Sequence, residues 1–146
     1  MDLNFFKTTR ILDGGMGQEL LARGMKPNGT LWSANALLNE EYHKLLLDTH
    51  LDFIQAGAEV IVTTTFTTRK TRLKDNNVED KFEYLNKKAG EIALKAKKQN
   101  PNILVAGGLP PQYLTYEADT REEDEIFENF YSQAKLLNPY VDFFYF

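Results

Sequence analysis

Four short apolar runs alternate with amphipathic segments along this chain, and this alternation constrains the fold more than any other feature. The runs lie at residues 10–13, 59–66, 103–106 and 141–146 and are rich in Ile, Val, Leu and Phe. Strands with one solvated face alternate between apolar and polar residues, whereas strands buried on both faces of a parallel sheet do not. The sequence therefore predicts an α/β fold built around parallel strands.

The segments between the runs carry apolar residues at the three- and four-residue spacing of helices. We expect one helix over residues 43–54, stopped by Gly57, and a second over 82–96, with Asn77 as its N-cap. A third helix is expected after the capping-box spacing at 120–123. The predicted core face of this third helix comprises Ile126, Phe127, Phe130, Tyr131, Ala134 and Leu137.

The spacing of the runs favours a barrel. Successive strand ends lie about 40 to 50 residues apart, which is enough for one right-handed crossover helix each. A TIM barrel, (β/α)₈, has about 250 residues, so a chain of 146 residues predicts the first four strand-helix units, apparently truncated. Residues 1–146 then form a single, incomplete domain. Because the last run ends without a following helix, we expect the gene to continue.

The composition excludes several classes of protein. Lys and Arg number 17 against 21 Asp and Glu, and the net charge of -4 provides no broad positive surface for nucleic acid or anionic lipid. No apolar run approaches the ~20 residues of a membrane helix, and the N-terminus lacks a signal-peptide pattern. We therefore expect a cytoplasmic protein with a small-molecule partner. The chain has no cysteine, so it cannot by itself supply a disulfide, a thiol nucleophile or a thiolate metal site.

The residues after the first run carry the strongest functional signal. Asp13 ends the run, and a glycine-rich turn over 14–17 leads into a helical pattern. Ligands bind at the carboxyl ends of strands in α/β proteins, so Asp13 is expected to contact a substrate. Capping of the turn by Asp13 is the structural alternative. A dinucleotide-binding turn is disfavoured because Leu20 stands where the third glycine would pack.

The motifs along the chain together resemble the homocysteine S-methyltransferases, which include betaine- and S-methylmethionine-dependent enzymes and the homocysteine-binding module of cobalamin-dependent methionine synthase. The similar segments are colinear and span almost the whole chain. They are Leu12-Asp13-Gly14-Gly15-Met16-Gly17, Glu19-Leu20, Arg23-Gly24, Leu31-Trp32-Ser33-Ala34, His50, Ala56-Gly57-Ala58-Glu59-Val60-Ile61-Val62-Thr63 and Val105-Ala106-Gly107.

This resemblance implies a (β/α)₈ barrel that binds homocysteine at its strand ends, holds the sulfur on zinc and transfers a methyl group from a cationic donor to give methionine. Zinc coordination keeps the sulfur as a nucleophilic thiolate. In the family the zinc ligands are usually three cysteines in the second half of the barrel. We therefore expect zinc in the full-length protein, with no ligands for it in this chain.

The resemblance also assigns site residues. Asp13 would accept hydrogen bonds from the substrate ammonium group, while Gly14 and Gly15 would let the backbone approach it closely. Thr65 and its backbone would meet the substrate carboxylate, and Phe66 would form a wall of the pocket. The partners are then a homocysteine-like thiol amino acid and a methyl donor. This chain would supply part of the amino-acid pocket, without catalytic or metal-binding residues, and would be inactive alone.

Two segments depart from the family pattern. Gln18 replaces the usual Thr, and Gly107-Gly108-Leu109-Pro110-Pro111 stands in place of Gly-Ser-x-Gly-Pro. The second change alters the loop after the third strand and leaves the methyl donor and the substrate open. Two alternatives therefore stand beside the methyltransferase: a barrel relative with a different substrate, and a non-catalytic half-barrel that pairs with itself as a homo-oligomer to bury its open sheet edges.

Other polar residues have a structural explanation. His43 and His50 lie within one apolar stripe without a third ligand, which favours packed, hydrogen-bonded histidines over a metal site. Thr65 lies in a threonine run that suits a strand without any ligand, and the acids at 122–125 complement the dipole of a helix start. For Trp32, the sequence leaves open whether it closes the pocket or covers the barrel.

Overall fold

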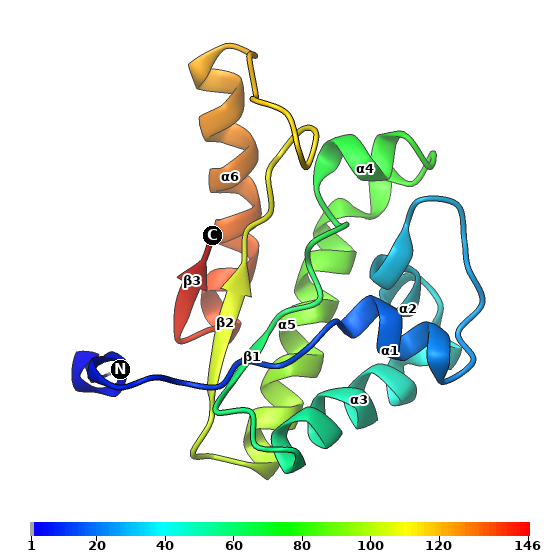
Figure 1. Cartoon of the computed structure of the whole chain (residues 1–146). Helices are drawn as coiled ribbons and strands as arrows, with labels where there is room; N and C mark the ends of the chain where they lie inside the picture. The colour runs from blue at the N-terminus through cyan, green and yellow to red at the C-terminus, as the bar shows by residue number, and fades with distance from the viewer. Residues whose placement is uncertain (1) are drawn as a thin grey trace.

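The computed structural model describes residues 2–146 and contains a parallel three-stranded sheet with helices packed against it (Figure 1). The strands, in spatial order, are β1 (Val60–Val62), β2 (Leu104–Gly108) and β3 (Phe143–Tyr145). Ile61 of β1 lies opposite Val105 of β2, and both side chains are fully buried. The predicted α/β class and parallel strand pairing are confirmed.

The first apolar run does not form a strand, so the prediction of four strands is wrong for residues 2–146. Leu12 makes a single parallel bridge to Val60, and the Asp13 N–H donates to the Val60 carbonyl at 2.9 Å. Ile11 is 59% exposed, so this segment is not buried on both faces as a central strand would be. The segment nevertheless runs parallel to β1 and carries Asp13 to the carboxyl edge of the sheet.

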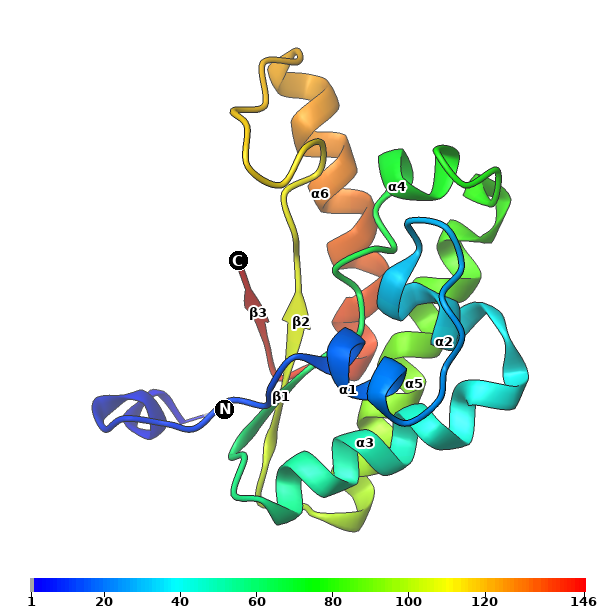
Figure 2. The same cartoon turned by 45° about the vertical axis from the view of Figure 1, so that its right-hand side comes forward.

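Helices occupy most of the chain between the strands, and Figure 2 shows α3, α5 and α6 together on one side of the sheet. Short 3₁₀ turns lie at Leu3–Lys7, Trp32–Ala34, Glu40–Tyr42, Glu79–Lys81 and Asn138–Tyr140. None of the helices in the described part of the chain has the length and apolarity needed to cross a membrane. The helices are α1 (Met16–Ala22), α2 (Asn35–Leu38), α3 (His43–Gln55), α4 (Lys70–Lys74), α5 (Phe82–Gln99) and α6 (Glu123–Leu137).

The helix ends agree only partly with the sequence signals. Gly57 follows α3 with a φ of +112°, as predicted for a helix stop. Asn77 is not the N-cap of α5; its φ is +55°, and its N–H donates to the Lys74 carbonyl just after α4. The capping box predicted at 120–123 is also wrong, because α6 begins after Glu122 and that side chain makes no capping hydrogen bond.

The core has two parts. Leucines of the helices, including Leu20, Leu46 and Leu85, form one cluster between α1, α2, α3 and α5. Small residues of α5 allow this helix to pack closely on the sheet, where Ala93 and Ala96 meet the strand side chains. Burial of a leucine side chain contributes about 1.5–3 kcal/mol, so the first cluster holds the helices to one another.

The predicted core face of α6 is wrong at two aromatic residues. Phe127 and Tyr131 are 61% and 51% exposed and stack on each other with ring centroids 5.6 Å apart. The buried residues of α6 are Leu137, as predicted, and the polar residues Asn129 and Gln133, which the prediction did not include. Gln133 is buried because its amide nitrogen donates to three acceptors in two other segments, the turn after β1 and helix α5.

Candidate functional site

Three chain segments leave the sheet at the same edge. Residues 13–17 lead into α1, residues 63–66 follow β1, and residues 109–111 follow β2. Because the strands are parallel, their carboxyl ends all point to this edge, as the ribbon in Figure 1 shows. Ligand sites of α/β proteins lie at this edge.

A two-lobed cleft lies between these segments. The two lobes are adjacent, because Val62, Thr63 and Phe66 line both of them. The first, which we call the polar lobe, has a volume of about 280 Å³ and is also lined by Asp13, Gly14, Gly15, Met16, Gly17, Trp32, Ser33 and Thr64. The second, the apolar lobe, has a volume of about 150 Å³ and is also lined by Gly108, Leu109, Pro110, Pro111, Tyr145 and Phe146.

Asp13 is the acidic side chain of the polar lobe. Its side chain is only 6% exposed, and Oδ2 accepts a hydrogen bond from the Val62 N–H at 3.0 Å. Burial raises the pKa of Asp13 to about 6, although the Val62 hydrogen bond acts in the opposite direction. A cation that entered the cleft would therefore relieve an unfavourable buried charge.

The glycines beside Asp13 make space for two aromatic side chains. A Cβ at Gly14 would come within 2.8 Å of the Phe53 ring, and a Cβ at Gly17 would collide with the Trp32 indole. Trp32 itself has a φ of +50°, an uncommon conformation for a bulky residue, and it lines the polar lobe. The structure thus places Trp32 in the wall of the cleft, which the sequence alone could not decide.

The three consecutive threonines have different positions. Thr63 and Thr64 line the polar lobe, whereas Thr65 is fully buried and lines neither lobe. The Thr65 hydroxyl donates to the Gly108 carbonyl at 2.6 Å and lies 2.9 Å from the Thr63 hydroxyl. The Gly108 N–H in turn donates to the Thr63 hydroxyl at 3.0 Å. In this structure the Thr65 hydroxyl joins the ends of β1 and β2 behind the cleft, and the contact of Thr65 with the substrate carboxylate stays a prediction.

Phe66 is 48% exposed and forms the ridge between the two lobes. The backbone of Phe66 is held by Arg69 in the turn that follows. Arg69 is almost fully buried, and its guanidinium donates to the carbonyls of Phe66 and Tyr113 at 3.0 and 3.1 Å. Burial lowers the pKa of Arg69 below its usual value. Arg69 thus connects the segment after β1 with the loop after β2, and sequence reasoning missed it because no local pattern marks it.

The two histidines do not share a site. The His43 Nε2 lies 3.0 Å from the Leu37 carbonyl, away from the cleft. His50 is fully buried on α3, and its Nε2 lies 3.4 Å from the Thr64 hydroxyl. Burial lowers the pKa of His50 to about 4, so this imidazole is neutral at physiological pH.

The cleft does not fit a zinc ion. Zinc sites need three or four Cys, His, Asp or Glu ligands close together, and the described residues contain no such group. The chain has no cysteine, and Asp13 is the one acid among the residues that line the two lobes.

Comparison with known proteins gives the family. Residues 10–146 match the family model described as homocysteine S-methyltransferase. The chain belongs to the homocysteine S-methyltransferase family. It is 33% identical over 126 residues to homocysteine S-methyltransferase 2 of Zea mays, with 77% of this chain and 36% of that protein covered. It is 34% identical over 120 residues to the homocysteine S-methyltransferase of Escherichia coli K12, with 77% of this chain and 38% of that enzyme covered.

A solved member of the family has the same architecture. The metallated form of the homocysteine methyltransferase MmuM from Escherichia coli superposes with a TM-score of 0.79 at 28% identity. The match covers 97% of this chain and 54% of that one, so this chain spans about half the length of the solved homologue. The three-stranded sheet and its helices therefore have the fold of a family member.

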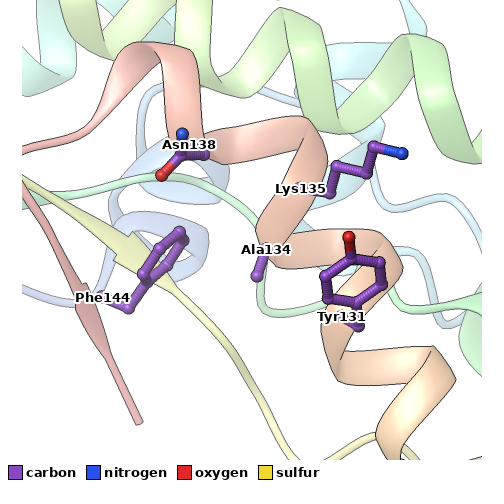
Figure 3. Close-up of a pocket in the computed structure, with 5 residues that line it drawn as sticks. All are labelled: Tyr131, Ala134, Lys135, Asn138 and Phe144. Atoms are coloured by element: carbon purple, nitrogen blue, oxygen red, sulfur yellow. The ribbon is translucent and has the colours of Figure 1, made fainter.

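A further hollow of about 320 Å³ lies between α6 and β3, outside the cleft (Figure 3). Its lining residues are Tyr131, Ala134, Lys135, Asn138 and Phe144. It contains no acidic or histidine side chain, and in Figure 3 the Lys135 side chain points away from Phe144. This hollow offers no anionic partner for an amino-acid substrate, so the two-lobed cleft is the better candidate site.

Proposed function

We propose that this chain forms the amino-acid-binding wall of an enzyme that transfers a methyl group from a cationic donor to the sulfur of homocysteine, giving methionine. The observation that carries this proposal is the position of Asp13. A carboxylate that is nearly buried, with a raised pKa, lines a cleft at the strand ends of a homocysteine S-methyltransferase family fold. The homologues' names supply the substrate class, and Asp13 supplies a partner for its ammonium group.

Each wall of the polar lobe would contact a different part of the substrate. Asp13 accepts hydrogen bonds from the ammonium group, and this cation holds the carboxylate in its ionised form. Gly14 and Gly15 leave the backbone open to close approach. The substrate carboxylate meets the Thr63–Thr64 segment, because these two residues line the lobe and Thr65 does not. Phe66 directs the thiol chain towards the apolar lobe.

The reaction itself is a substitution at carbon. The thiol loses its proton, the sulfur forms a bond to the methyl carbon, and the bond between methyl and donor breaks with its electron pair remaining on the donor. In this arrangement Asp13 is paired with the substrate ammonium group and is not free to take the thiol proton, which passes to a base outside this chain. This chain therefore binds and orients the amino acid, and groups outside it activate the thiol.

Calorimetric titration of the chain under reducing conditions tests this proposal. We expect L-homocysteine to bind, and 4-mercaptobutanoate, which has the same thiol and carboxylate but no ammonium group, to bind at least about tenfold more weakly. The chain alone is expected to form no methionine from homocysteine and S-methylmethionine. Equal affinities for the two thiols, or methionine formed above the blank rate, would contradict the assignment.

A further inference from the structure

His50 is a buried imidazole that faces Asp13. It is fully buried on α3, and its Nδ1 has no hydrogen-bond partner among the described residues. This Nδ1 lies 3.9 Å from Asp13 Oδ2, and Nε2 lies 3.4 Å from the Thr64 hydroxyl. An orphaned polar atom of this kind is unfavourable in a protein interior, which suggests that it serves another residue.

The neighbours of the ring select one neutral tautomer. A neutral imidazole carries one proton, on Nδ1 or on Nε2. A proton on Nδ1 faces the Asp13 carboxylate, while the Thr64 hydroxyl can donate to the lone pair on Nε2. The opposite tautomer would turn a lone pair towards the carboxylate oxygen, which is repulsive. The arrangement therefore favours the proton on Nδ1.

We propose that His50 is a positioning residue for Asp13: its Nδ1–H stabilises the ionised carboxylate from behind and keeps it directed into the polar lobe. The present 3.9 Å separation is longer than a hydrogen bond, and functional hydrogen bonds are often long before the ligand binds. The Val62 N–H donates to the same oxygen at 3.0 Å. A small rotation of the carboxylate about this hydrogen bond would bring Oδ2 within hydrogen-bond distance of Nδ1. The inference rests on the proposed function, since Asp13 is the residue assigned to the substrate ammonium group.

Other charged groups near α3 do not compete for this role. Several of those on α3 and near it pair with one another at the surface, and among the described residues only Asp13 lies within ion-pair distance of His50. The surface pairs are Lys44 with Asp48, Arg23 with Glu19 and Asp52, Arg10 with Glu59, and Lys88 with Glu91.

Nuclear magnetic resonance on the whole chain, labelled with ¹⁵N in histidine and ¹³C in aspartate, tests the proposal without a substrate. The sequence has two histidines, so a His43→Gln variant assigns the signals and serves as a control away from the cleft. We expect the His50 ring to carry its proton on Nδ1 between about pH 5 and 8. In His50→Leu, the titration midpoint of the Asp13 carboxyl should rise, by up to about one pH unit, because the ionised carboxylate loses the Nδ1–H dipole that faces it.

His50→Asn separates positioning from packing. Its amide nitrogen branches at the same position as Nδ1 and keeps a donor towards Asp13, so we expect a midpoint close to that of the unmodified chain. A proton on Nε2, or an unchanged midpoint in a folded His50→Leu chain, would overturn the proposal. If His50→Leu does not fold, the position of the ring proton in the unmodified chain and the Asp13 midpoint in His50→Asn still test the proposal. A failure of homocysteine to bind would count against the proposed function and leave these readouts unchanged.

Discussion

Replacement of Asp13 by Asn should stabilise the free chain and weaken its ligand binding, two effects of opposite direction. Asn has nearly the same shape, and its carbonyl oxygen can still accept the Val62 N–H that Asp13 Oδ2 accepts at 3.0 Å. The substitution therefore removes a buried charge and little else. Burial raises the pKa of Asp13 from 3.8 to about 6, so the folded chain holds this charge at a cost in free energy above that pH.

The size of the effect follows from this difference in pKa. The folded state keeps the Asp13 proton at pH values where the unfolded state has lost it, so the free energy of unfolding decreases as the pH rises from about 4 to about 6. One pKa unit corresponds to about 1.4 kcal/mol, which gives roughly 3 kcal/mol as the full difference. Asp13→Asn lacks this titration and should be about 2 to 3 kcal/mol more stable than the unmodified chain at pH 8.

Urea unfolding followed by circular dichroism at about pH 4 and pH 8 measures the stability effect. Calorimetry at pH 8 should show an affinity for homocysteine lower by about 1.5 to 3 kcal/mol, the range for a charge-assisted hydrogen bond. Equal stability of the two chains at pH 8 would refute the argument from burial. Unchanged affinity in a folded Asp13→Asn chain would remove Asp13 from the binding site.

Three further predictions test the walls of the cleft. Gly17→Ala should displace the Trp32 indole and destabilise the chain by about 1 to 3 kcal/mol. The fluorescence emission of the single tryptophan should shift and the urea midpoint should fall, and an unchanged emission spectrum would exclude this contact. Thr65→Val removes the hydrogen bond to the Gly108 carbonyl and should lower the free energy of unfolding by about 1 to 3 kcal/mol. The affinity of the folded variant for homocysteine should change by less than about twofold. A large loss of affinity with unchanged stability would instead place Thr65 in the pocket. After dialysis against zinc, elemental analysis should find well below one metal ion per chain. One zinc ion per chain would contradict the finding that the described residues contain no group of three metal ligands.

The parts of the fold that could be predicted are those that depend on burial. The continuous apolar runs at β1 and β2 predicted parallel strands, because residues covered on both faces of a sheet are apolar without alternation. The run at β3 also forms a parallel strand, although its residues are only partly buried or exposed. The run at 10–13 has two apolar residues between Arg10 and Asp13, makes one bridge and leaves Ile11 exposed. An apolar run shows that a segment can join a sheet. How many of its residues pair depends on the neighbouring strand, which a local sequence pattern does not contain.

Helix ends and helix faces were harder to predict because side-chain hydrogen bonding competes with apolar spacing. Apolar spacing placed Phe127 and Tyr131 in the core of α6, but Gln133 occupies the buried face because the Thr65 carbonyl, the Thr68 hydroxyl and the Asn86 amide oxygen all accept from it. The hydrogen bonds of a buried amide can stabilise a helix face more than burial of an aromatic ring would. Such partners are 47 to 68 residues away in sequence, and no local window reveals them.

The candidate site was predictable to the level of the strand end but not of the individual side chain. Parallel strands bring their carboxyl ends together, so Asp13, Gly14, Gly15 and Phe66 could be placed at one edge from topology alone, and all four line the cleft. Beyond the last ladder residue, however, successive side chains need not alternate regularly. Thr65 turns behind the cleft because its hydroxyl reaches the Gly108 carbonyl of the neighbouring strand. The same irregular turn brings the Thr64 hydroxyl to within 3.4 Å of the His50 ring, which is part of the arrangement from which the role of His50 is inferred.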